Sequence, residues 1–143
     1  FVVTGLVLAA AGIERLELKP KSRLLRRREM LPPAGQGALA VMCRSDNEAV
    51  LSRLRTINHE PSETICRAER TFLSRLEGGC EAPIGALARL SNETLELTGR
   101  VTAPDGSRQV TDTLEDSPEN PEELGRRLAD QFLEQGVDEL LER

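Results

Sequence analysis

The chain has 143 residues, 30% of them charged, and a formal net charge of −5 at pH 7. This length suits one compact domain, or a small domain joined to part of another. The acidic balance disfavours a nucleic-acid surface, which needs clustered Lys and Arg side chains. Aromatic residues make up 2%, without Trp or Tyr, so no stacking platform for bases is expected.

The three cysteines stand at irregular intervals that do not indicate a disulfide framework, and a reducing cytoplasm is the predicted compartment. The apolar run at residues 1–13 is shorter than the ~20 residues that span a bilayer, and it lacks the basic start of a signal peptide. We therefore expect no membrane segment. We interpret the run as a buried strand cut from a larger protein, of which this chain is a C-terminal fragment.

Residues 5–10 form a continuous apolar stretch, which predicts a strand buried on both faces. Residues 11–18 then show helical spacing, and such a pair is typical of a parallel α/β layer. A basic cluster follows at residues 19–28. A solvated helix face is the favoured interpretation of this cluster over an anion site, because charge runs usually face water.

A proline pair, Pro32 and Pro33, interrupts any helix before the next motif. This motif is Gly35-Gln36-Gly37, a backbone that a ligand can approach closely, with one amide side chain to donate or accept a hydrogen bond. Residues 38–43 are predicted to form an apolar strand that buries Cys43.

Two amphipathic helices follow. The first covers residues 45–57, with Ser45 or Asp46 as its cap, and ends at a break over residues 58–61, where we place a domain boundary. The second begins at the proline that closes this break, and its apolar stripe leaves Glu69 and other charged residues outside. The stripe consists of Ile65, Ala68, Phe72 and Leu76.

The second helix leads into Gly78-Gly79-Cys80, where either glycine can adopt the left-handed conformation that closes a helix. Cys80 is thus displayed on a tight loop, and its simplest interpretation is a half-buried structural thiol. Neighbouring Glu77 and Glu81 disfavour a thiolate, so a free attacking nucleophile is not supported. A zinc site is not expected either, because no two potential ligands show the close spacing of structural sites. These potential ligands are Cys43, His59, Cys66 and Cys80.

Alternating apolar and polar residues predict three antiparallel strands, at residues 83–90, 94–102 and 107–114. Asn92 serves the first turn and Pro104-Asp105-Gly106 the second. The last helix begins with Asn120 as its cap and ends at Gly136, with a short turn over residues 137–141. The order helix, three strands, helix predicts an α+β fold in which a three-stranded antiparallel sheet is packed by helices.

Three segments of the sequence, in this order, resemble the porphobilinogen deaminase (hydroxymethylbilane synthase) family. They are LAAAGIERL at residues 8–16, LPPAGQGA at residues 31–38 and LEGGCEAPIG at residues 76–85. Pro33-Ala34 stands where the family usually has Ala-Val. The resemblance covers essentially the whole chain. It implies part of a transferase that condenses four porphobilinogen units head to tail, with loss of ammonia, to give hydroxymethylbilane.

The resemblance also implies a covalent dipyrromethane cofactor that holds the growing chain and is joined to Cys80 by a thioether. Arg15 matches an arginine that contacts the acidic side chains of the cofactor and the growing chain, which suits bidentate pairing with carboxylates. Gln36 and Gly37 match positions beside the cofactor. The family's catalytic aspartate lies in a preceding domain, so we expect no catalytic residue in this chain and no turnover by the chain alone.

By the same resemblance, residues 1–31 are the α/β end of domain 2, which is similar to a periplasmic binding protein. Residues 32–59 then cross back to domain 1, and residues 60–143 form the cofactor-attachment domain. The expected partners are porphobilinogen, the growing polypyrrole and the preceding domains of the same protein. We expect a monomer with no nucleic-acid, membrane or metal partner. The alternative is a non-catalytic regulatory or interaction module in which Cys80 is structural.

Overall fold

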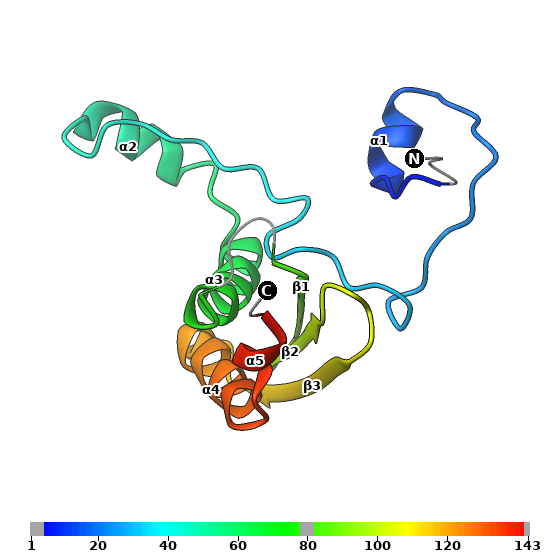
Figure 1. Cartoon of the computed structure of the whole chain (residues 1–143). Helices are drawn as coiled ribbons and strands as arrows, with labels where there is room; N and C mark the ends of the chain where they lie inside the picture. Colours follow the sequence, from blue (N-terminus) through cyan, green and yellow to red (C-terminus); the bar gives the residue numbers. More distant parts are fainter. Residues whose placement is uncertain (1–4, 78–81, 142–143) are drawn as a thin grey trace. The chain divides into compact units, whose positions relative to one another are not determined.

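The computed structural model describes residues 5–77 and 82–141 of the chain (Figure 1). The chain divides into two compact units, Phe1–Met30 and Leu31–Arg143. Within the described residues, the second unit contains a three-stranded sheet and most of the helices.

The first unit contains one helix within its described residues, α1 (Ala10–Arg15). The strand predicted over residues 5–10 is not formed in the described part of this unit, and Leu6 is 77% exposed. The prediction was wrong because a buried parallel strand requires ladder partners on both sides, and the described rest of the unit provides no other strand. The basic cluster at residues 19–28 is largely exposed, as expected, but it is not helical. The preceding helix has already ended before Glu17, whose φ of 52° is incompatible with a right-handed helix.

The sheet of the second unit is antiparallel throughout, with the strand order β1-β2-β3. Its strands are β1 (Ile84–Ser91), β2 (Thr94–Thr102) and β3 (Gln109–Asp116), each within two residues of the predicted bounds. The turn between β2 and β3 places Gly106 at φ 74°, and the Asp105 carboxylate accepts a hydrogen bond from the Ser107 N–H at 2.9 Å. The turn chemistry read from the sequence is therefore confirmed.

Two helices, α3 (Glu60–Arg75) and α4 (Pro121–Glu134), pack against one face of this sheet (Figure 1). Phe72 and Phe132 meet edge to face between them, with ring centroids 5.2 Å apart. The helices approach closely at Gly125, where an added Cβ would lie 2.5 Å from the carbonyl oxygen of Ala68. The remaining fully buried large side chains are Leu95, Leu97, Val101, Leu124, Leu128 and Val137. Burying each contributes about 1.5–3 kcal/mol, so this layer holds the sheet and helices together.

Gly136 adopts φ 71° directly after α4, and the short helix α5 (Val137–Leu141) follows it. Both the predicted end of the last long helix and the predicted short turn after it are therefore confirmed. At the start of α4, Asn120 occupies the cap position as predicted, but its side chain makes no capping hydrogen bond. The helix start relies instead on Pro121 in the first turn.

Helix α2 (Glu48–Arg55) is shorter than predicted and is capped by Asn47, whose Oδ1 accepts a hydrogen bond from the Val50 N–H at 3.2 Å. The choice of Ser45 or Asp46 as the cap was wrong. The carboxylate of Asp46 is engaged by Arg44, whose guanidinium donates to both of its oxygens at 3.0 and 2.7 Å. An aspartate held in this way is no longer free to cap the helix.

The strand predicted over residues 38–43 is also not formed. Leu39 and Met42 are 98% and 91% exposed, and Cys43 is half-buried rather than part of the core. An extended apolar segment becomes a strand only beside another strand, and among the described residues none pairs with this one.

The left-handed residue that closes helix α3 comes before Gly78 and Gly79, the two candidates that the sequence offered. Glu77 adopts φ 53°, and its N–H donates to the carbonyl oxygen of Ser74 at 3.1 Å. The left-handed closing residue is therefore a glutamate, where the sequence suggested a glycine. Gly78 and Gly79 themselves lie outside the described residues.

Candidate functional site

The Gly35-Gln36-Gly37 motif forms two successive tight turns. The Gln36 N–H donates to the carbonyl oxygen of Pro33 at 3.2 Å, and the Ala38 N–H donates to that of Gly35 at 3.1 Å. Gly35 and Gly37 adopt φ angles of 72° and 90°, which residues with a Cβ rarely adopt. The turns leave Gln36 and Gly37 exposed, and a Cβ placed on Gly37 would meet no atom within 4 Å. A ligand can therefore approach this backbone closely.

Residues 31–35, which we call the strap, pass around the free edge of β1. On that strand the side chains of Ile84 and Ala86 enter the core, so Gly85 between them points to the opposite face of the sheet. Leu31 lies on that opposite face, because a Cβ on Gly85 would stand 2.7 Å from the Cβ of Leu31. Ala34 packs against the core on the helix side.

One backbone hydrogen bond fixes the strap to the edge itself. The Ala86 N–H donates to the carbonyl oxygen of Pro32 at 3.0 Å. The strap thus starts on the outer face of the sheet, bonds to the edge and ends on the core side. The Gly35-Gln36-Gly37 turn follows directly where the strap reaches helix α3.

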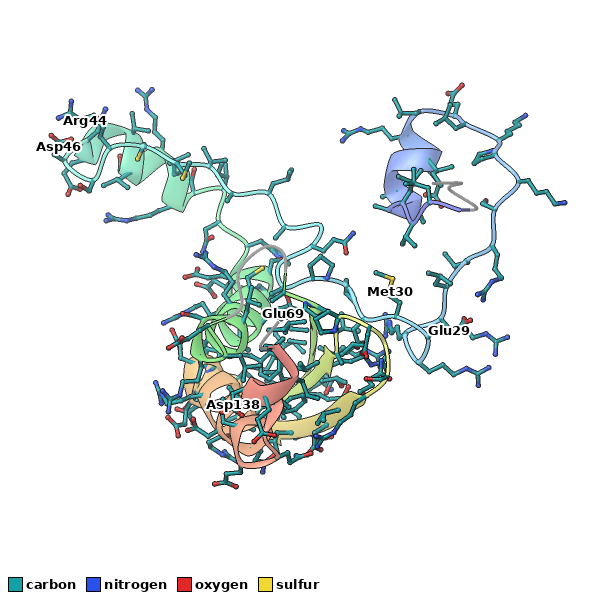
Figure 2. All side chains as sticks on the ribbon, in the orientation of Figure 1. Glu29, Met30, Arg44, Asp46, Glu69 and Asp138 are labelled. Carbon is teal, nitrogen blue, oxygen red and sulfur yellow. The ribbon has the colours of Figure 1, made fainter. Side chains whose placement is uncertain are left out.

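Glu69 is the one buried charged residue in the described part of the chain, with 5% of its surface exposed (Figure 2). Its Oε2 accepts a hydrogen bond from the Gly35 N–H at 2.7 Å, and its Oε1 accepts one from the Ala88 N–H at 2.8 Å. Burial raises the pKa of Glu69, while these two N–H donors act in the opposite direction. A single carboxylate therefore joins α3, β1 and the strap.

Sequence analysis missed this role of Glu69 and placed the residue outside the apolar stripe. Glu69 stands four residues after Ile65 and four before Leu73, and both of these pack against the core. On a helix such positions share one face. A carboxylate at that spacing was the signal that a buried acid with backbone partners should be sought.

The residues predicted to bind a cofactor are placed as follows. Gln36 and Gly37 lie together in the turn after the strap. Arg15 is the last residue of α1 in the first unit and is exposed. Cys80 lies outside the described residues. Leu76 and Ala82, which precede and follow it in the sequence, both pack against the core that the strap also contacts.

An open groove of about 720 Å³ between α3 and α4 is lined by Arg67, Arg70, Arg75 and Arg126. Three of these arginines form ion pairs with acids of α4: Arg67 with Glu122, Arg75 with Asp130 and Arg126 with Glu123. Such exposed pairs describe a solvated charge network. In the same groove, burial and then the nearby Glu69 charge raise the pKa of Cys66, which keeps this thiol protonated at neutral pH.

Across residues 5–77 and 82–141, no group of three or more His, Cys, Asp or Glu side chains is arranged to hold a metal ion. Within the same residues, no helix has the length and apolar character to cross a membrane.

These features define a class of protein: an α+β domain whose edge strand is strapped to a glycine-rich turn open to a ligand. Comparison with known families gives the particular one. Residues 2–52 match the family model described as porphobilinogen deaminase, dipyromethane cofactor binding domain, and residues 64–134 match porphobilinogen deaminase, C-terminal domain. The chain belongs to the porphobilinogen deaminase family.

Curated relatives named porphobilinogen deaminase agree with this assignment. The chain is 41% identical over 139 residues to that of Synechococcus elongatus, covering 96% of this chain and 43% of the relative. It is 43% identical over 142 residues to that of Chlorobium chlorochromatii, covering 96% and 45%. It is 43% identical over 143 residues to that of Desulforudis audaxviator, covering 99% and 46%. The chain therefore spans less than half the length of the curated relatives it matches.

Proposed function

We propose that this chain is the C-terminal part of a hydroxymethylbilane synthase, a cytoplasmic transferase that condenses four porphobilinogen units head to tail with loss of ammonia. The observation that carries the proposal is the ordered match of two domain models of this one enzyme along the chain. In this proposal residues 1–31 end domain 2, residues 32–59 cross back to domain 1, and residues 60–143 attach the cofactor.

The proposed cofactor is a dipyrromethane joined to Cys80 by a thioether. When bound, it would supply the primer from whose free end the chain of pyrrole units is extended. Gln36 and Gly37 fit such a group, because their turn is exposed and has open space at the glycine. Arg15, Gln36 and Gly37 also fall in the stretch matched by the cofactor-binding model, and Cys80 falls in the C-terminal one.

Each of these residues has a distinct proposed role. The Cys80 sulfur anchors the growing pyrrole chain, so that successive additions become effectively intramolecular. Because the sulfur ends as a neutral thioether, it requires no lowered thiol pKa during turnover. The Arg15 guanidinium pairs with acetate and propionate groups in bidentate fashion, and the Gln36 amide orients the pyrroles by hydrogen bonding.

The anchor is tested by intact mass spectrometry of the full-length enzyme. We expect a mass excess equal to two linked pyrroles, lost in Cys80→Ser and retained in the matched control Cys43→Ser. An unmodified thiol at position 80 in an active enzyme would instead support a non-catalytic module with a structural cysteine.

We further propose that this chain alone, incubated with porphobilinogen, forms no tetrapyrrole at an enzymatic rate. The reason is that the family's catalytic aspartate belongs to a preceding domain. Absorbance of the released product gives the measurement, with the full-length enzyme as the positive control. Product formation by the chain alone would place the catalytic group within these residues.

A further inference from the structure

We propose that Glu69 is a positioning residue, which holds the strap against α3 and β1 and so sets where Gln36 and Gly37 stand on this domain. The inference rests on the proposed function of Gln36 and Gly37 beside the cofactor. Nothing in that function by itself requires a buried carboxylate on α3.

The geometry of the carboxylate is the first step. Its two oxygens are used separately, one by Gly35 of the strap at 2.7 Å and one by Ala88 of β1 at 2.8 Å. A carboxylate accepts at both oxygens, whereas an amide of the same shape accepts at one and presents N–H groups at the other. Glu69→Gln therefore keeps the volume and places a donor against a donor on one side.

The position of Glu69 in the fold is the second step. Helix α3 and strand β1 follow each other in the chain. Glu69 belongs to α3 and bonds directly to β1, so it ties these two elements together. The same side chain bonds to Gly35, the residue before Gln36. One group thus fixes the start of the Gly35-Gln36-Gly37 turn to both elements.

The close packing at Gly85 supports the same inference independently. A Cβ at this position would stand 2.7 Å from the Leu31 Cβ and 3.3 Å from the Pro32 carbonyl oxygen, so the strap lies in direct contact with β1. The strap is therefore held at two points, by packing at Leu31 and by hydrogen bonding at Gly35.

The test compares Glu69→Gln with the matched control Glu93→Gln in the full-length enzyme; Glu93 lies exposed in the turn between β1 and β2. Site-resolved hydrogen exchange reports the strap directly. We expect the Gly35 and Ala88 amides to exchange about tenfold faster or more in Glu69→Gln, with core amides of α3 and β2 unchanged. We expect kcat/KM for porphobilinogen to fall about tenfold, mainly through kcat, because misplaced groups weaken transition-state binding.

Two outcomes overturn the inference: unchanged exchange at Gly35 and Ala88, or faster exchange there with unaltered kinetics. A merely structural role would raise exchange throughout the core as well. Should Glu69→Gln fail to fold, Gly85→Ala displaces the strap with Glu69 intact, and the same two readouts decide. Intact mass of the unaltered enzyme tests the proposed function separately from the role of Glu69. If the cofactor mass is absent, the proposed function is refuted, and the exchange data alone then decide whether Glu69 holds the strap.

Discussion

Glu77 holds a backbone conformation that suits glycine. At φ 53° its Cβ is crowded against the backbone, which costs roughly 1–2 kcal/mol for an L-residue. Replacing it with glycine removes this cost but adds freedom to the unfolded chain, which offsets roughly 0.4–1 kcal/mol. We therefore expect Glu77→Gly to raise the free energy of unfolding of this chain by about 0.5–1 kcal/mol, measured by urea denaturation.

The control for this prediction is Glu93→Gly, also in an exposed turn but without positive φ. It gains nothing from the substitution and loses unfolded-state restriction. A stabilisation of the same size in both variants would show that the left-handed backbone of Glu77 is not the cause.

Single residues also show where sequence analysis reaches its limit. The alternation around Leu95 and Leu97 predicts β2 correctly, because successive side chains of a half-buried strand face the core and the solvent in turn. Glu69 was misassigned, because a charged residue is assigned to the solvent side unless its backbone partners are known. Those partners, Gly35 and Ala88, lie 34 and 19 residues away in the chain, and no local pattern connects them.

Within the helix α3, the buried carboxylate of Glu69 makes stability depend on pH. Burial raises its pKa in the folded state, so the folded chain binds a proton more tightly than the unfolded chain does. The stability linked to this proton is fully present below the ordinary pKa of 4.5 and is lost as pH rises through the folded value. We therefore expect the unfolding free energy of the unaltered chain, relative to Glu69→Gln, to increase as pH falls from 7 toward 4.5.

Urea denaturation of both variants across this pH range gives the measurement. Since all other acids are shared, their titration cancels in the difference between the two variants. A difference that is constant or shrinks on acidification would contradict the raised pKa.

The close contact between α3 and α4 depends on Gly125, which has no side chain. An added methyl group at Gly125 would lie 2.5 Å from the Ala68 carbonyl oxygen and 2.9 Å from the Thr71 Cβ, so the helices must separate. We expect Gly125→Ala to destabilise the chain by about 1–3 kcal/mol, the usual cost of overpacking, although alanine is the better helix former. Arg126→Ala, at the next and exposed position, is the matched control and should change stability by less than about 0.5 kcal/mol.

At the scale of the whole molecule, the apolar residues outside the core are the conspicuous feature. Leu39, Val41 and Met42 are 98%, 63% and 91% exposed in a segment predicted to be a strand. Exposed apolar stretches of this kind mark surfaces that another part of a protein covers. We propose that preceding domains of a longer protein cover this segment, since the chain spans less than half the length of the relatives it matches.

We therefore expect this chain to self-associate, and Leu39→Ser with Met42→Ser to reduce that association in sedimentation velocity. In the full-length enzyme, where we propose that the preceding domains bury the segment, the same double substitution should instead lower the thermal midpoint. Glu93→Ser serves as the control in both proteins. Equal association of the substituted and unaltered chains would assign the contact to another surface.

The strap has one more consequence, for the behaviour of the chain in concentrated solution. An uncovered outer strand offers its amide groups as a template on which a foreign polypeptide can extend the sheet. On β1 the outward amides of Ala86 and Ala88 are already occupied, by Pro32 and by Glu69. We therefore expect a variant that releases the strap to form fibrils, because other polypeptide strands can then pair with the exposed edge of β1.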